Sequence, residues 1–128
     1  MGGVLGEVTM AATSMYVADL DAAVEWYRTN LDLEPVSIGT DRHPYATYSF
    51  NGALLVLEPL KALYQGGGAT GSGATSVNLV VDRDPADVRA DLMARGVECS
   101  EIVESNFSSF LVCDPDGNRF YVTAPLKR

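Results

Sequence analysis

The sequence is poor in the residues that bind transition metals and form disulfide bonds. Its 128 residues include one histidine and two cysteines, Cys99 and Cys113. The cysteines do not form a C-x-x-C pair, and the first residues lack the basic segment and apolar run of a secretory signal. These absences favour a reduced, cytoplasmic protein.

Basic residues and long apolar runs are also scarce. Nine basic residues face 17 acidic ones, and the formal net charge is -8. A nucleic-acid backbone or an anionic membrane surface would therefore be repelled, whereas a cationic ligand would be attracted, although solubility alone explains a negative surface. No apolar stretch approaches the ~18 residues that span a bilayer. With 47% hydrophobic and 20% charged residues, the chain is typical of one globular domain, residues 1–128.

The hydrophobic pattern of the first half predicts one strand, one helix and three further strands. Asp19 is placed to cap a helix that buries Leu20, Ala23, Val24, Tyr27 and Leu31. Asn51-Gly52 is a strong hairpin signal. The strands are expected at Ala12–Val17, Val36–Ile38, Tyr45–Phe50 and Ala53–Leu57.

The second half repeats this order. Residues 61–75 are rich in glycine and predict a flexible linker. After it, Asp84 and Pro85 predict a helix start and Gly96 its end. The strands are expected at Ser76–Val81, Val97–Val103, Phe107–Cys113 and Arg119–Thr123. The chain is therefore expected to be α+β, with two βαβββ modules at about 10–60 and 76–126.

Two segments at this separation resemble a known family. The segment Tyr16–Leu33 resembles the opening strand and helix of the vicinal-oxygen-chelate superfamily, which includes glyoxalases and bleomycin-resistance proteins, and Asp114–Asn118 resembles its closing hairpin. The resemblance covers nearly the whole chain after the first ten residues. It implies that the two modules form a cupped mixed sheet, often completed by a second subunit, so a homodimer is expected.

The resemblance also implies four positions for a divalent metal, where metalloenzymes of the superfamily carry His, Glu or Gln. Aligning the two halves places these positions at Ala12, Leu55, Ser76 and Tyr121. Methyl and isobutyl groups donate nothing to a metal, and a serine hydroxyl or a phenol is a weak ligand. No metal and no other cofactor is therefore expected.

Residues on the cup face of the strands are the candidates for ligand binding. Apolar and aromatic side chains with a few isolated polar groups are typical of sites for small organic molecules. The only histidine, His43, falls in a predicted turn. The simpler interpretation is that it is a solvated loop residue, and the alternative is that it lines the rim of the cup. The candidate ligand-binding residues are Ser14, Tyr16, His43, Tyr48, Leu55, Leu57, Asn78, Arg119 and Tyr121.

These features favour a binding protein without catalysis, which sequesters an aromatic or cationic natural product as the metal-free bleomycin-resistance branch does. The alternative is a metal-independent enzyme of lyase, isomerase or cyclase type that acts on an oxygen-rich molecule. In that case Tyr121, Arg119, Tyr16 or His43 would donate a proton or stabilise charge. Two possibilities remain. One is a metal-dependent lyase, epimerase or dioxygenase, if the alignment of the two halves that places the metal positions is shifted. The other is a purely structural or regulatory module that binds a partner.

Overall fold

The computed structural model describes residues 3–6, 12–59 and 76–126, so the predicted linker at 61–75 lies outside the described residues. A short 3₁₀ turn, η1 (Gly3–Leu5), precedes the modules. The first module contains β1 (Ala12–Val17), α1 (Leu20–Leu31), β2 (Ser37–Ile38), β3 (Ala46–Phe50) and β4 (Ala53–Pro59). The second contains β5 (Ser76–Val80), α2 (Pro85–Ala94), β6 (Val103–Glu104), β7 (Phe107–Cys113) and β8 (Arg119–Pro125). Two βαβββ units in this order confirm the predicted α+β fold class.

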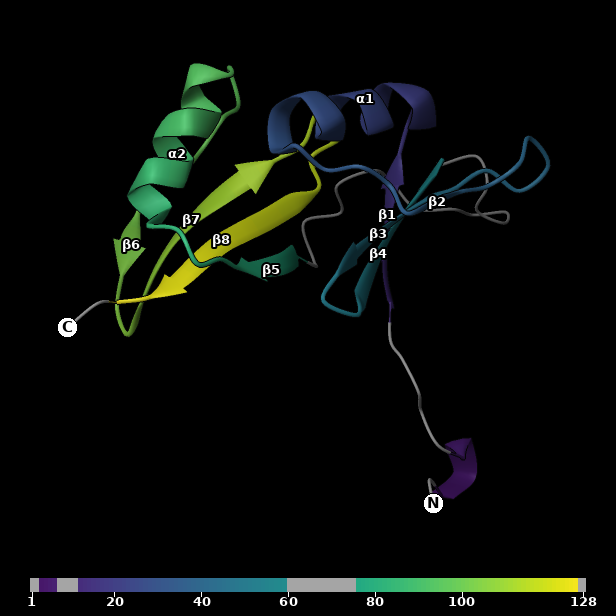
Figure 1. Ribbon diagram of the computed structural model, residues 1–128, viewed down its shortest axis with the longest axis horizontal. Helices are drawn as coiled ribbons and strands as arrows, with labels where there is room; N and C mark the ends of the chain where they lie inside the picture. The colour runs from purple at the N-terminus through teal and green to yellow at the C-terminus, as the bar shows by residue number, and fades with distance from the viewer. Residues whose placement is uncertain (1–2, 7–11, 60–75, 127–128) are drawn as a thin grey trace.

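Each module builds one four-stranded mixed sheet, with strand orders β1-β4-β3-β2 and β5-β8-β7-β6. In both sheets the first strand pairs in parallel with the last strand of its module, and the other pairs are antiparallel. Figure 1 shows α1 and α2 on the same side of the two sheets. One face of each sheet therefore contributes to a helix-covered core, and the opposite face is free for other contacts. We call the latter the open face.

Local sequence signals explain where the helices begin and where the first hairpin turns. Asp19 accepts a hydrogen bond from the backbone N–H of Ala22, and Asp84 accepts one from Ala86, both at 3.0 Å. Asn51 and Gly52 both have positive φ, 54° and 93°, as a two-residue turn matched to the strand twist requires. These three predictions are confirmed.

One predicted strand is wrong. Val97–Val103 was expected to be extended and paired, but only Val103–Glu104 joins the sheet, and Cys99 forms an isolated bridge with Val112. The N–H of Ser100 still donates to Leu111 of β7, but other backbone groups of the intervening segment bond to α2. The N–H of Val97 donates to Leu92 at the end of α2, and the carbonyl of Ser100 accepts from the Arg89 guanidinium at 2.7 Å.

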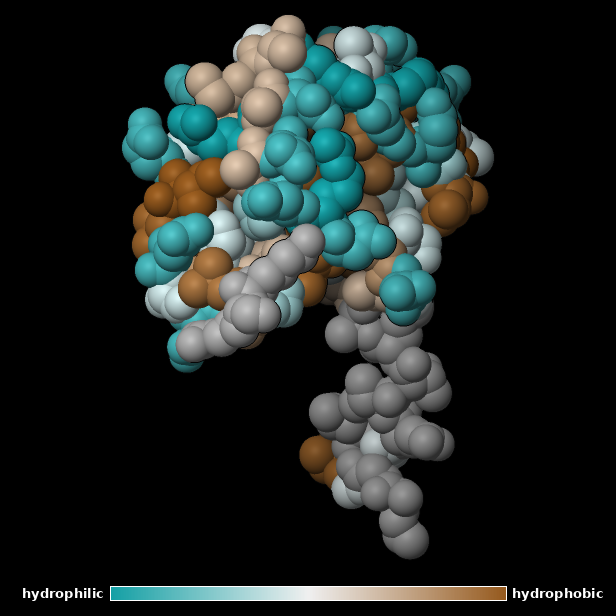
Figure 2. Space-filling view, turned by 60° about the vertical axis from the view of Figure 1, so that its left-hand side comes forward, coloured by the Kyte–Doolittle hydropathy of each residue, from teal (hydrophilic) through white to brown (hydrophobic). Residues whose placement is uncertain are grey.

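The core consists of apolar side chains on the helix-covered faces. Tyr27 is fully buried, and its ring stacks on Tyr48 and packs edge-on against Phe120 of the second module, at centroid distances of 5.6 and 5.8 Å. Tyr27 therefore connects the cores of both modules. In the space-filling view, apolar patches interrupt the hydrophilic surface (Figure 2).

Candidate functional site

The open face of the second sheet carries three of the six predicted ligand-binding residues that remain accessible. On β8, Phe120 and Val122 are buried under the helices, so Arg119, Tyr121 and Thr123 alternate with them onto the open face. Pairing places Asn78 of β5 beside Tyr121. The structure therefore brings together three of the predicted residues, Asn78, Arg119 and Tyr121, on one surface.

A chain of hydrogen bonds crosses this surface. The hydroxyl of Thr123 donates to Oδ1 of Asn78 at 2.8 Å, and the hydroxyl of Ser109 lies 3.2 Å from that of Thr123. The bonded oxygen fixes the orientation of the Asn78 amide, whose nitrogen carries two further donors. This arrangement presents a polar group of defined orientation next to the Tyr121 ring.

Arg119 supplies a donor without an acceptor. Its Nε is buried, and no atom of the residues that the structure describes accepts a hydrogen bond from it. A buried donor without a partner costs free energy, and guanidinium groups bond strongly to planar oxygen acceptors. Because Nε is covered, a ligand would meet the rest of this half-buried guanidinium, which is suited to bind a carbonyl, carboxylate or phenolate oxygen that reaches the open face.

The open face of the first sheet differs from the one predicted. The expectation placed Leu55 and Leu57 in the cup, but both are core residues, with exposed fractions of 1% and 0%. The face assignment of β4 was wrong by one residue. Its open-face residues are Leu54, Val56 and Glu58, which pair with Ala12, Ser14 and Tyr16 of β1.

Tyr48 and His43 also lie away from the expected surface. Tyr48 is 1% exposed and belongs to the core, because the antiparallel pairing of β3 with β4 places it beside Leu55. His43 is exposed in the turn between β2 and β3, where its backbone N–H bonds to Thr40. Of the predicted residues in the first module, Ser14 and Tyr16 keep an open-face position.

The corrected register changes one of the four metal positions implied by the family resemblance. Ala12 pairs with Leu54 and Ser76 pairs with Arg119, so the residue equivalent to Tyr121 is Val56 rather than Leu55. Valine provides no ligand atom. Within the described ranges, no three His, Cys, Asp or Glu side chains come together in a group that could hold a metal ion. The donor set therefore does not fit a divalent metal of the kind that the superfamily's metalloenzymes bind.

The turn between β7 and β8 joins the two modules. The buried carboxylate of Asp114 accepts from the Tyr27 hydroxyl at 2.7 Å and from Nδ2 of Asn118 at 2.9 Å. Burial, followed by the neighbouring Asp114 carboxylate, raises the pKa of Tyr27 well above its usual range. Asp116 accepts from the N–H of Ala18, and Asn118 donates to the carbonyl of Tyr16. The residues of this turn were interpreted as a tight turn and given no catalytic role, and its contacts with the first module are a further finding.

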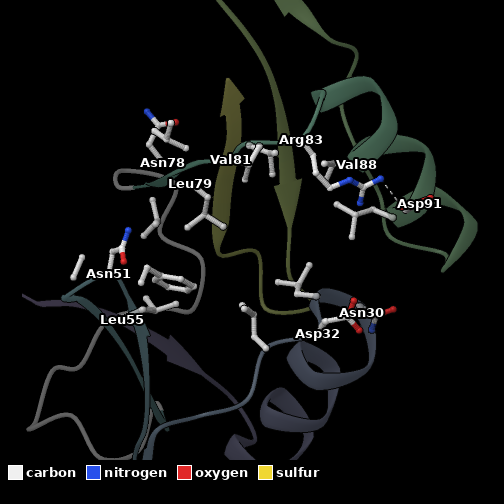
Figure 3. Close-up of a pocket in the computed structure, with 18 of the residues that line it drawn as sticks. Asn30, Asp32, Asn51, Leu55, Asn78, Leu79, Val81, Arg83, Val88 and Asp91 are labelled. Atoms are coloured by element: carbon white, nitrogen blue, oxygen red, sulfur yellow. Dashed lines mark hydrogen bonds and ion pairs between the residues drawn. The ribbon is translucent and has the colours of Figure 1, made fainter. Parts of the chain in front are cut away.

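A separate cleft of about 670 Å³ lies between the modules. Residues of β5, α2, β4 and the end of α1 line it, and Figure 3 shows their side chains around the space between the two modules. Leu55 and Asn78 are the predicted site residues in its lining. Sequence reasoning missed this cleft, because its existence depends on how the two modules pack and not on a local motif.

With this geometry established, comparison with known proteins identifies the family. The model of the Glyoxalase/Bleomycin resistance protein/Dioxygenase superfamily matches residues 9–122. The chain belongs to this superfamily. No curated protein matches the chain. The described part contains no helix long and apolar enough to cross a membrane.

Solved structures with the same fold include a superfamily member from Sphaerobacter thermophilus DSM 20745, with a TM-score of 0.79 and 22% identity over 92% of this chain and 98% of that one. TnmS3, an antibiotic binding protein from Streptomyces sp. CB03234, has a TM-score of 0.78 and 20% identity, covering 94% and 98% of the two chains. TioX from Micromonospora sp. ML1 has a TM-score of 0.71 and 17% identity, covering 93% and 100%. At these identities the likeness shows a shared fold.

Proposed function

We propose that this superfamily member binds an aromatic small molecule, neutral or cationic, that carries oxygen acceptors, and that it does so without a metal and without changing the molecule. The observation that carries the proposal is the half-buried guanidinium of Arg119, which lies on the open face two residues from Tyr121 and whose Nε has no acceptor among the described residues. The guanidinium would bind an oxygen of the ligand while the Tyr121 ring packs on its aromatic system.

The polar groups around Arg119 support an oriented mode of binding. Asn78 adds amide donors held in place by Thr123. On the first sheet, the carboxylate of Glu58 lies beside Tyr16 on the open face. Together with the net charge of -8, that carboxylate would favour a ligand with a positive charge. A fold shared with an antibiotic binding protein is consistent with a role in resistance.

The proposed assembly is a homodimer in a reducing, cytoplasmic environment. The open face of the second sheet exposes three large apolar side chains, Val80 at 71%, Val103 at 68% and Phe107 at 47%. Apolar groups at this exposure are suited to contact another surface, and a second copy could close the open face over a ligand. Cys99 and Cys113 are free thiols, in keeping with a reducing environment.

An enzyme that acts without a metal is the second candidate, and the same guanidinium favours it. A donor bonded to a carbonyl oxygen withdraws electron density from its carbon, and a nearby phenol such as Tyr121 can donate a proton. This candidate predicts a chemically altered ligand. The binding proposal predicts recovery of the original molecule.

The test replaces Arg119 by Gln, which removes the guanidinium, its terminal donors and its charge and keeps a polar, shorter side chain. For an anthraquinone with ring hydroxyl groups, we expect the dissociation constant to rise by about tenfold or more, because a hydrogen bond involving a charged group contributes about 1.5–3 kcal/mol. Arg89→Gln is the matched control, since Arg89 bonds to the Ser100 carbonyl away from the open face. Unchanged affinity in Arg119→Gln would rule out this binding mode.

A further inference from the structure

Because the two modules repeat the same order of elements, the cleft between α2 and the turn before β4 has an equivalent place between α1 and the turn before β8, and that place is closed. The two helices occupy equivalent places in their modules, and Tyr27 and Leu92 each lie eight residues after the N-cap. Tyr27 reaches the turn before β8 and bonds to Asp114, which closes that junction. Leu92 is shorter and has no hydroxyl, and it lines the cleft together with Asn51 of the turn before β4. The size of one side chain thus contributes to closing one junction and leaving the other open.

The surface of the cleft is mainly apolar and almost neutral. Leu79, Val81 and Val88 project from the second module around the central space, as Figure 3 shows. The charged groups at its edge are paired. Arg83 lies 3.0 Å from Asp91, and Arg95 lies 3.1 Å from Asp32. A charged ligand would therefore have to compete with an existing ion pair.

The size of the cleft matches that of small-molecule sites. Its volume of about 670 Å³ falls within the roughly 300–1,000 Å³ typical of pockets for drug-sized molecules. Asn30 and Asn51 also line it, and their amides can form a few directional hydrogen bonds. Apolar walls with a small number of neutral polar groups select for shape and apolar area rather than for charge.

We propose that this cleft is a second binding site, and that it takes an uncharged, largely apolar ring compound with one or two carbonyl or hydroxyl groups. The cleft adjoins the open faces at Leu54, Asn78 and Val80, but Arg119 and Tyr121 are not part of its lining. Its walls come from β5 and α2 of the second module and from β4 and the end of α1 of the first. Ligand binding there would contact both modules at once and would stabilise their packing. This inference does not depend on the function proposed for the open face.

The test uses the neutral dye Nile red, whose fluorescence rises in apolar surroundings. We expect saturable binding to the full chain, weakened about tenfold or more by Val88→Trp, because the larger ring fills the cleft. Met93→Trp is the matched control, since Met93 lies on the same helix, is 49% exposed and is outside the lining. Tyr121→Ala, which alters the open face, should leave the affinity unchanged.

Methyl NMR of the unaltered protein provides a second readout that does not depend on how the variants fold. Nile red should shift the methyl signals of Leu79 and Val88 before those of Val103 on the open face. The proposal would be overturned if the dye did not saturate, if Val88→Trp bound it like Met93→Trp, or if Tyr121→Ala abolished binding while Val88→Trp did not. The last outcome would assign the dye to the open face and leave the proposal for that surface standing.

Discussion

Tyr27 and Tyr48 are neighbouring buried tyrosines whose hydroxyl groups have different surroundings. The Tyr27 hydroxyl donates to the buried Asp114 carboxylate at 2.7 Å, whereas that of Tyr48 has no partner among the described residues. A hydrogen bond to a charged acceptor stabilises the fold, and a buried hydroxyl without a partner does not. The two residues are therefore expected to respond in opposite ways to the same substitution.

For Tyr27→Phe we expect a loss of about 1.5–3 kcal/mol in the free energy of unfolding, because the bond to Asp114 is removed. Tyr48→Phe, the matched control, should be neutral or slightly stabilising. Urea denaturation of both variants at pH 7.5 measures the difference. Equal destabilisation by the two substitutions would show that the Tyr27–Asp114 bond contributes nothing beyond ring packing.

The same tyrosine gives a prediction for alkaline pH. The ordinary pKa of a tyrosine is 10.0, and burial with the adjacent Asp114 raises the pKa of Tyr27 in the folded state. Above about pH 10 the unfolded chain therefore releases this proton while the folded chain keeps it, so stability falls as pH rises. Between pH 9 and 11, unfolding free energies should decrease less steeply in Tyr27→Phe than in the unaltered protein. Parallel pH profiles would contradict the inferred shift.

At the scale of elements, caps and turns could be predicted from the sequence, but the face of one strand could not. Asp19, Asp84 and Asn51-Gly52 act through bonds to residues close in sequence, so their patterns indicate the structure directly. The segment Ala53–Leu57 is apolar on both faces, so alternation does not distinguish them. The pairing of β4 with β1 makes that distinction, and it forms between residues far apart in the chain.

The cap of α2 provides the test at this scale. Asp84→Ala removes the acceptor for the N–H of Ala86, and we expect a loss of about 1 kcal/mol in unfolding free energy. Asp82→Ala, in the exposed segment before the helix, is the control for loss of negative charge. Thermal or urea denaturation that fails to separate the two variants would show that the cap adds no stability.

At the scale of the whole molecule, each of the two four-stranded sheets has an open face that no helix covers. On the open face of the second sheet, the exposed apolar side chains of Val80, Val103 and Phe107 are the basis of the proposed homodimer. The family resemblance predicted two modules and a cup. The packing between them was beyond sequence reasoning, because Tyr27, Asp114 and Arg95 form the junction through contacts between distant segments. The cleft between the modules, whose lining includes Arg95, arises from the same packing.

The dimer is tested by a charge on the open face. A lysine in place of Val80 would be desolvated if another copy covered it, at a cost that favours the monomer. We expect sedimentation to show a dimer for the unaltered chain and a shift towards monomer for Val80→Lys. Val36→Lys is the control, since Val36 is also exposed, at 64%, and precedes β2 in the other module. A monomeric unaltered chain, or the same dimer in Val80→Lys, would contradict the proposed assembly.

The central claim is that the open face around Arg119 binds an oxygen-bearing aromatic molecule and returns it unchanged. The most direct measurement is equilibrium dialysis of chelator-treated protein against hydroxylated anthraquinones and naphthoquinones, with oxygen-free fused-ring compounds as controls and mass spectrometry of every compound before and after. We predict saturable binding of the oxygenated compounds, loss of that binding in Arg119→Gln, and recovery of each compound at its original mass. Absence of binding, or binding that Arg119→Gln leaves intact, would contradict the proposed site, and recovery of an altered compound would establish the protein as an enzyme.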